Sequence, residues 1–240
     1  MKQVLITGAS SGIGTALVHE YAAAGWQVTA CGRNAERLQS VRDATGCAVL
    51  EFDVADREST LAALQGVETP WDLVILNAGT CEYIDDVRAF DAALFERVMH
   101  INTVGTANCL QAILPGLQSG SRVAIVGSTA SYLPFSRASA YGGSKAAIAY
   151  LAGSLAVDLK PHGVGVSLVS PGFVKTPLTD LNDFNMPMMI TAEQAAEAMR
   201  RGLEKGKSHV CMPWVFCAFL RVLGRLPFAW RVAVARKMAK

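Results

Sequence analysis

The stretch Gln3-Val-Leu-Ile-Thr-Gly-Ala-Ser-Ser-Gly-Ile-Gly14 decides the fold of this 240-residue chain. Its first four residues predict a short strand, and a helical pattern follows over residues 15–24. Glycines 8, 12 and 14 between these elements allow a tight turn and a close approach of the backbone to a ligand. The start of the helix offers free N–H groups and a positive dipole end to a pyrophosphate. The stretch predicts a dinucleotide site, and a purely structural turn is the alternative.

The alternation of strand and helix continues along the chain. Further strands are predicted at 26–31, 48–52, 73–76, 122–126, 163–169 and 208–212, and helices at 35–44, at 58–64 and from residue 191. Buried strands alternating with amphipathic helices predict an α/β protein with a three-layer Rossmann fold. We expect a doubly wound parallel sheet of about seven strands, which binds its ligands at the carboxyl ends of the strands.

The end of the second predicted strand indicates the choice of cofactor. An acidic residue there would bind the ribose hydroxyls of NAD and repel a 2′-phosphate. This chain has Gly32-Arg33 instead, and arginine offers several donors and a permanent charge to a phosphate. We therefore expect NADP(H) to be favoured over NAD(H). A solvated arginine at the start of the next helix is the alternative.

Polar residues also follow the third and fourth predicted strands. Asp53-Val54 follows one of them and fits an adenine site. Asn77-Ala78-Gly79 follows the other and fits the wall of a ribose site. Simple turn chemistry would explain either segment equally well.

Tyr141, Lys145 and Ser128 are the candidate reactive residues. Tyr141 and Lys145 are four residues apart, so they share one face of a predicted helix. A phenol with an ordinary pKa of about 10 needs a nearby cation to stabilise the phenolate at neutral pH. Ser128 follows the strand at 122–126 and can hydrogen-bond a substrate oxygen that Tyr141 protonates. An exposed Tyr and Lys on an ordinary helix are the alternative, because this pair alone occurs in many proteins.

Taken together, residues 1–205 resemble the short-chain dehydrogenase/reductase family. The motifs that carry the resemblance are Thr7-Gly-x3-Gly-x-Gly14, Asn77-Ala-Gly79, Asn102, Ser128, Tyr141-x3-Lys145, and Ser170-Pro-Gly172 through Thr176. The resemblance implies that Tyr141 is the general acid-base and that Ser128 orients the substrate carbonyl. It implies that Lys145 lowers the pKa of Tyr141 and binds the nicotinamide ribose.

The resemblance also gives Asn102 a role, that of holding a proton-relay water through a local helix distortion. From its residue type alone, a helix cap is the alternative. His100 is expected to be structural. The cofactor-binding residues expected from the motifs and the resemblance are Gly8, Ser10, Ser11, Gly12, Ile13, Gly14, Arg33, Asp53, Val54, Asn77, Ala78, Gly79, Tyr141, Lys145, Pro171, Gly172, Val174 and Thr176. A homodimer or homotetramer through the catalytic helices is implied as well.

Residues 177–190 are predicted to form a lid over the substrate. The apolar members of this segment are Leu178, Leu181, Phe184, Met186, Met188 and Met189. Unbranched thioethers adapt to varied shapes, so the lid predicts a lipophilic carbonyl or alcohol substrate. Packing of the methionines onto the core is the alternative. Asp180 and Asp183 are expected to be solvated loop residues.

Residues 213–240 are predicted to form a basic helical extension of the oxidoreductase domain at 1–212. Two helical runs, 213–226 and 228–238, are broken at Pro227. From residue 205 onward the chain has eight basic residues and no acidic one, whereas 14 basic and 20 acidic residues precede it. Arg221 and Arg225 beside aromatic residues are typical of a helix lying in a membrane surface. A protein interface is the alternative, and the acidic body argues against a nucleic-acid partner.

The remaining composition points to a cytoplasmic protein. The hydrophobic fraction is 51%, but no apolar run approaches the roughly 18 residues of a spanning helix. The start of the chain lacks the pattern of a secretion signal. The extension would allow a peripheral location at the inner face of a membrane. The cysteines at 31, 47, 81, 109, 211 and 217 show no CxxC pair, so we expect reduced thiols and no metal site.

The sequence thus predicts an NADP(H)-dependent oxidoreductase that interconverts a carbonyl and a secondary alcohol. The alternative is a catalytically idle nucleotide-binding protein of the same fold, acting in sensing or in membrane-associated interaction.

Overall fold

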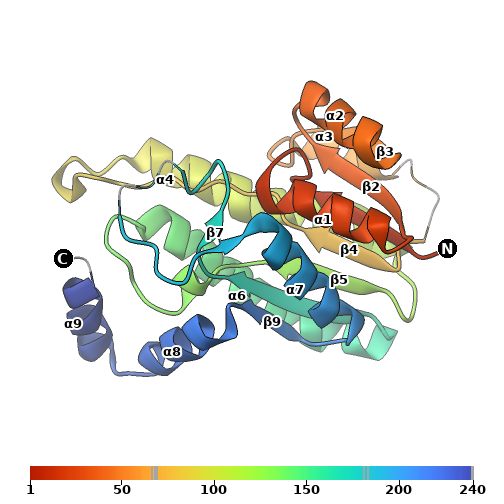
Figure 1. Cartoon of the computed structure of the whole chain (residues 1–240). Helices are drawn as coiled ribbons and strands as arrows, with labels where there is room; N and C mark the ends of the chain where they lie inside the picture. Colours follow the sequence, from red (N-terminus) through yellow and green to blue (C-terminus); the bar gives the residue numbers. More distant parts are fainter. Residues whose placement is uncertain (66, 68–69, 181, 183, 239–240) are drawn as a thin grey trace.

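A single parallel sheet forms the centre of the computed structural model, which describes residues 1–65, 67, 70–180, 182 and 184–238 (Figure 1). Its strands are β1 (Gln3–Thr7), β2 (Gln27–Gly32), β3 (Ala48–Glu51), β4 (Leu73–Leu76), β5 (Arg122–Val126), β6 (Gly165–Pro171) and β9 (His209–Met212). Within the described residues this sheet has seven strands, in the order β3-β2-β1-β4-β5-β6-β9, and every pair is parallel. The predicted Rossmann fold is confirmed.

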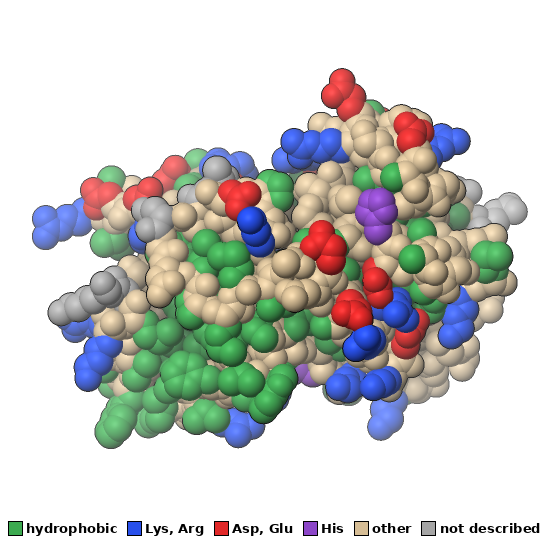
Figure 2. All heavy atoms as spheres, in the orientation of Figure 1, with side chains coloured by type: hydrophobic (Ala, Val, Ile, Leu, Met, Phe, Trp, Pro, Cys, Tyr) green, Lys and Arg blue, Asp and Glu red, His purple; other side chains and the backbone are tan. Residues whose placement is uncertain are grey.

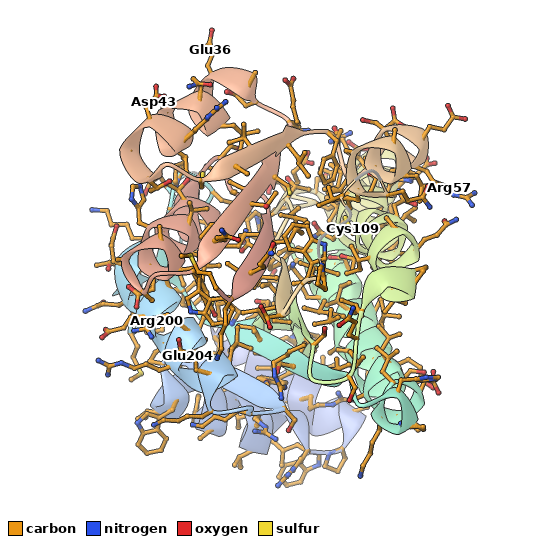
Figure 3. All side chains as sticks on the ribbon, turned by 90° about the vertical axis from the view of Figure 1, so that its right-hand side faces the viewer. Glu36, Asp43, Arg57, Cys109, Arg200 and Glu204 are labelled. Carbon is orange, nitrogen blue, oxygen red and sulfur yellow. A yellow bond between two sulfur atoms is a disulfide. The ribbon has the colours of Figure 1, made fainter. Side chains whose placement is uncertain are left out.

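Helices cover both faces of the sheet. They are α1 (Gly12–Ala23), α2 (Ala35–Thr45), α3 (Arg57–Gln65), α4 (Ala92–Met99), α5 (Gly105–Ile113), α6 (Ser139–Asp158), α7 (Ala192–Glu204), α8 (Trp214–Gly224) and α9 (Phe228–Met238). Successive strand residues point to opposite faces: Val4 and Ile6 pack with α1, α2 and α7, and Leu5 packs with α3, α5 and α6. Figure 3 shows Cys109 of α5 lying against the sheet, while Glu36 of α2 points outward. Because helices cover both faces of the sheet, the strands consist largely of consecutive apolar residues.

Local signals fix the ends of several helices. Asn34 caps α2 by accepting a hydrogen bond from the Arg37 N–H at 2.8 Å. A capping box starts α7, with Thr191 as its first member and Gln194 as its second. Arg200 of α7 then pairs with Glu20 of α1 at 2.7 Å and with Glu204 at 2.8 Å (Figure 3). The pair of Arg200 and Glu20 links α7 to α1 on one face of the sheet.

Two element starts differ from the sequence prediction by two or more residues, and one small sheet was not predicted. Helix α1 begins at Gly12 instead of residue 15, so its first turn includes Gly14. Strand β6 begins at Gly165 instead of residue 163, because Gly163 adopts a left-handed conformation with φ 71°. A small sheet of β7 (Val174–Lys175) and β8 (Ile190–Thr191) was not predicted. Strands of two residues are too short for a periodicity signal, yet this pair closes the base of the predicted lid.

The expectation of reduced cysteines is wrong for one pair. Cys211 lies in β9 and Cys217 lies in α8. A disulfide joins the two residues. The turn from β9 into α8 brings their Cα atoms to 6.2 Å, a separation that a disulfide can bridge. Cys31, Cys47 and Cys109 are free and buried, as expected.

The two helical runs predicted after residue 212 are present as α8 and α9. Phe216, Leu220 and Ala235 from these helices are buried with Leu133, which lies between β5 and α6. Gly224 approaches the same segment closely, since a Cβ there would lie 2.6 Å from the Tyr132 carbonyl oxygen. The helices thus pack over the connection from β5 to α6. Within the described part of the chain, no helix has the length and apolar character needed to cross a membrane.

Candidate active site

A cavity of about 550 Å³ opens at the carboxyl ends of β1 to β6. The predicted residues that line it are Gly8, Ser10, Ser11, Gly12, Ile13, Arg33, Asp53, Val54, Asn77, Ala78, Gly79, Ser128, Tyr141, Lys145, Pro171, Gly172, Val174 and Thr176. Two predicted residues, Gly14 and Asn102, do not line the cavity. The sheet therefore brings segments far apart in the sequence to one site, at the edge where such sheets bind ligands.

The turn from β1 into α1 has no room for side chains at its glycines. A Cβ at Gly14 would lie 2.0 Å from the Gly8 carbonyl oxygen, and a Cβ at Gly8 would lie 2.8 Å from the Ala78 Cα. Gly8 and Gly12 also have positive φ values of 66° and 55°. Gly14 thus serves the packing of the turn, while the other predicted residues of the turn line the cavity.

The start of α1 is suited to an anion. Ser11 is its N-cap, but its side chain makes no capping hydrogen bond, and no acidic residue lies in the first turn. The N–H groups of this turn are therefore left for a ligand in the adjoining cavity. The uncapped helix start and the glycine turn fit the pyrophosphate of a dinucleotide.

Thr7 and Asn77 join the ends of β1 and β4. The Thr7 hydroxyl oxygen accepts hydrogen bonds from the N–H groups of Asn77 at 3.0 Å and Ala78 at 3.1 Å. The Asn77 side-chain amide donates to the Thr7 carbonyl at 3.1 Å. These bonds fix the cavity wall beside the glycine turn.

Arg33 and Arg37 place two cations at the same end of the cavity. Arg33 Nη1 lies 3.6 Å from Asp53 Oδ2, and the two side chains are 71% and 40% exposed. An ion pair this exposed is weak and exchanges readily for another partner. Arg37, in the first turn of α2, was not predicted as a site residue. The fit to a 2′-phosphate rests on both guanidinium groups.

Tyr141 lies in the first turn of α6, and Lys145 follows one helical turn later. Ser128 lies two residues after the end of β5, and its hydroxyl interacts with the Tyr141 phenol. The Ser128 oxygen also accepts from the Ala130 N–H at 3.1 Å, which orients the side chain. Burial raises the pKa of Tyr141, and nearby Cys81 raises it further, whereas the Ser128 hydrogen bond lowers it. The net shift is upward.

The net shift of the Tyr141 pKa is upward in the free protein, and the lowering expected from Lys145 stays a prediction. The Lys145 ammonium lies 5.8 Å from the centre of the Tyr141 ring and donates to the Val126 carbonyl at 3.0 Å. Desolvation is the largest cause of the upward shift, and Lys145 is not among its causes. Tyr141 is consequently a neutral phenol in this state, and a neutral phenol is a proton donor.

Lys145 is itself buried, with 5% of its surface exposed. Burial lowers its pKa to about 8, and the proximity of Cys81 opposes that shift. An amine with a pKa of about 8 changes its charge within the range in which enzymes are assayed. The charge of Lys145 therefore depends strongly on what the cavity contains.

Asn102 sits in the helix distortion expected there, the π-helix His100–Val104. Its side-chain oxygen accepts from the Thr80 N–H at 2.8 Å. Its amide donates to the Thr80 carbonyl and to Ser144 Oγ, both at 2.9 Å. Asn102 lies inside a continuous helical segment, so it is no cap, and it ties the loop after β4 to α6. The expected structural role of His100 fits its contact with the Ala55 carbonyl at 3.0 Å.

Aromatic and apolar side chains adjoin the reactive residues. Phe184 packs edge-on against Tyr83, with ring centres 5.6 Å apart, and against Phe173 at 6.1 Å. Leu178 lines the cavity directly. Met188 and Met189 are exposed instead of packed into the core, and Asp180 is exposed as expected. Leu181 and Asp183 lie outside the described residues.

Comparison with known proteins identifies the family of the chain. A family model described as short chain dehydrogenase matches residues 2–185. The chain belongs to the short-chain dehydrogenase family. An uncharacterised oxidoreductase of Myxococcus xanthus is 35% identical, and the match covers 99% of this chain and 97% of the relative.

Two serine dehydrogenases are among the proteins to which this chain is similar. The serine 3-dehydrogenase of Rhizobium radiobacter is 31% identical over 73% of each chain. The closed form of serine dehydrogenase complexed with NADP+ has the same fold, with a TM-score of 0.81 and 24% identity. That match covers 88% of this chain and 94% of the other. The family match shows that the chain is an oxidoreductase of the short-chain dehydrogenase family.

Sequence reasoning missed several residues of the short-chain dehydrogenase site. Arg37 could have been found, because it lies in the first turn of the helix that follows Arg33. Cys81 and Tyr83 follow the Asn77-Ala78-Gly79 segment, but nothing in their spacing indicates that Cys81 interacts with Tyr141 and Lys145. That proximity depends on the fold.

Proposed function

We propose that this short-chain dehydrogenase uses NADP(H) to interconvert a carbonyl and a secondary alcohol on a lipophilic substrate. The observation that carries the proposal is the meeting of Ser128, Tyr141 and Lys145 in the cavity that also holds the glycine turn. A protein that only bound a nucleotide would have no need of a phenol, a serine hydroxyl and a lysine ammonium gathered in this way.

The cavity supports an assignment of residues to each part of the cofactor. The turn at Gly8 to Gly12 and the start of α1 would hold the pyrophosphate. Arg33 and Arg37 would hold the 2′-phosphate, and Asn77 and Lys145 would bind the nicotinamide ribose. When bound, NADPH supplies the hydride to the carbonyl carbon. The serine dehydrogenase of similar fold was determined with NADP+.

The chain's own residues would supply and stabilise the proton. In the reduction direction Tyr141 donates its phenolic proton to the carbonyl oxygen, which accepts it as the carbon receives the hydride. Ser128 hydrogen-bonds the same oxygen and orients the carbonyl. The charge left on Tyr141 is stabilised by Ser128 and by the Lys145 ammonium. Asn102 is proposed as a positioning residue, which holds α6 and the loop after β4 in register and supports a relay water.

NADPH affinity is expected to fall above pH 8. In the free protein Lys145 loses its proton at about this pH. If the ammonium donates to the ribose, binding favours the charged lysine, so the affinity is highest below the pKa. Above it, each further pH unit should weaken binding by up to about tenfold, since a proton must first be taken up. Fluorescence titration of NADPH from pH 7 to pH 9.5 measures this dependence.

The control for this titration is Lys145→Met, which should bind NADPH more weakly and lose the pH dependence. Constant affinity of the wild-type protein across this range would show that the Lys145 charge takes no part in binding.

A lipophilic substrate is supported by the side chains next to Tyr141. Leu178 lines the cavity, Tyr83 interacts with Tyr141, and the rings of Tyr83, Phe184 and Phe173 pack in series. Such surfaces gain from burying alkyl groups. We therefore propose medium or long alkyl carbonyl compounds as substrates.

The value of kcat/KM is expected to rise along a series of n-alkyl aldehydes or methyl ketones. Each buried CH2 contributes about 0.8 kcal/mol, so the rise should be about threefold to fourfold per carbon until the pocket is filled. Leu178→Ser should flatten this slope, whereas Val87→Ser, at an exposed position outside the cavity, should leave it unchanged. A flat slope in the wild-type protein, or a preference for carboxylate-bearing carbonyls, would contradict a lipophilic substrate.

We also propose assembly as a homodimer or homotetramer through α5 and α6. The supporting observation is that α6 exposes large apolar side chains, with Tyr150 83% and Val157 72% exposed. Exposed apolar groups along one helix are typical of contacts between subunits.

A further inference from the structure

The outer surface of α8 and α9 is apolar. Trp214 and Phe219 of α8 are 74% and 54% exposed, and Phe228 and Trp230 of α9 are 71% and 66% exposed. Figure 2 shows the hydrophobic side chains over these helices as one broad patch at the lower left of the molecule. Large aromatic side chains exposed together in this way indicate a surface that binds a partner.

The charged side chains on α8 and α9 are all basic. Arg221, Arg225, Arg236 and Lys237 are exposed on the same two helices, and no acidic residue occurs from residue 205 to the end. In Figure 2, Lys and Arg side chains border the patch, while the visible acidic side chains lie away from it. The partner must therefore accept apolar groups and carry negative charge.

The patch is connected to the substrate lid by packed aromatic rings. Phe216, on the inner side of α8, lies 5.6 Å from Phe173, and Phe173 lies 6.1 Å from Phe184 of the lid. Gly172 of the cavity wall also lies under α8, since a Cβ there would be 2.9 Å from the Phe216 ring. A partner on the outer side of α8 would thus sit beside the lid.

We propose that α8 and α9 bind the surface of an anionic lipid bilayer, with both helices lying in its plane. Their aromatic side chains enter the boundary between headgroups and acyl chains, and the basic residues face the anionic headgroups. Two tryptophans on the exposed side suit this boundary, where an apolar ring with a polar N–H is favoured.

Charge argues against a second copy of the chain as the occupant. A symmetric dimer through this patch would bring the same basic surface of both copies together, with no acidic residue from 205 onward to pair with it. An anionic lipid surface supplies the missing negative charge. Binding in this manner places the lid beside the lipid, and it does not depend on the catalytic proposal.

Co-sedimentation of the full-length protein with vesicles tests the inference. The protein should sediment with vesicles of phosphatidylcholine and phosphatidylserine at low salt, bind pure phosphatidylcholine vesicles much less, and be released by high salt. Arg225→Glu with Arg236→Glu should lower the partition coefficient on the order of tenfold or more. Arg42→Glu with Arg57→Glu changes the net charge equally, but these arginines lie on α2 and α3, so binding should persist.

A second pair of variants tests the apolar part. Trp214→Ser with Trp230→Ser should also lower the partition coefficient on the order of tenfold, because both rings would no longer enter the bilayer. Two results would overturn the inference. One is a full-length protein that fails to sediment with anionic vesicles at low salt. The other is a tryptophan double variant that keeps vesicle binding but changes from dimer to monomer in analytical ultracentrifugation, which would assign the patch to a second copy.

Discussion

Replacing Tyr141 with phenylalanine is expected to lower kcat on the order of 100-fold to 10,000-fold, the usual contribution of a general acid-base group. The substitution removes one hydroxyl and keeps the ring in its place at the start of α6. Burial keeps the phenol protonated in the free protein, so Tyr141 is ready to donate in the reduction direction. The affinity for NADPH should stay close to that of the wild-type protein, because the lost group acts mainly in proton transfer.

Tyr150→Phe is the matched control for this variant. It removes the same hydroxyl from the same helix, but Tyr150 is exposed and lies outside the cavity. Steady-state kinetics with NADPH and a carbonyl substrate should show wild-type rates for the control. A Tyr141→Phe protein that also turned over at the wild-type rate would remove Tyr141 from the mechanism.

The second large effect concerns the preference for NADPH. Loss of one charge-assisted hydrogen bond costs about 1.5–3 kcal/mol, so Arg33→Ala should weaken NADPH binding by roughly tenfold to 150-fold and NADH binding little. The variant also leaves Asp53 without its 3.6 Å ion pair, and the freed carboxylate would repel a 2′-phosphate. Adding Arg37→Ala should enlarge the loss for NADPH. Isothermal titration with both cofactors measures the change.

Arg42→Ala serves as the control for the arginine variants, because Arg42 is exposed on the same helix and does not line the cavity. Equal losses of NADPH and NADH affinity in Arg33→Ala would show that the arginine has no contact with the phosphate. A wild-type preference for NADH would lead to the same conclusion.

The buried strands were predictable because their sequence carries a strong signal. Strands β4 and β5 have the predicted ends, 73–76 and 122–126, since each is an apolar run bounded by polar or turn residues. The π-helix at Asn102 followed from the family resemblance and not from any local pattern. The pair β7 and β8 could not be predicted, because two-residue strands have no period.

The site was predictable in its membership but less so in its electrostatics. The motifs predicted that Ser128, Tyr141 and Lys145 act together, and all three line one cavity. The raised pKa of Tyr141 and the lowered pKa of Lys145 depend on burial, which is a property of the folded chain. The Cys211–Cys217 disulfide depends likewise on the turn between β9 and α8.

For the C-terminal helices α8 and α9, the sequence did not predict which side is buried. Helix α8 is apolar on most of its circumference, so its sequence does not tell which side is buried. The fold decides this by packing Phe216 and Leu220 inward, which leaves Trp214 and Phe219 on the outside.

Deuteride transfer tests the proposed hydride exchange most directly. NADPH labelled with deuterium at C4, on either face of the ring, is incubated with the full-length protein and a panel of lipophilic aldehydes and ketones. Mass spectrometry should find an alcohol with one deuterium on the carbinol carbon from one of the two labelled cofactors, and far less of it with Tyr141→Phe. A protein that binds NADPH but yields no deuterated alcohol from any carbonyl would contradict the account and leave a nucleotide-binding protein without turnover.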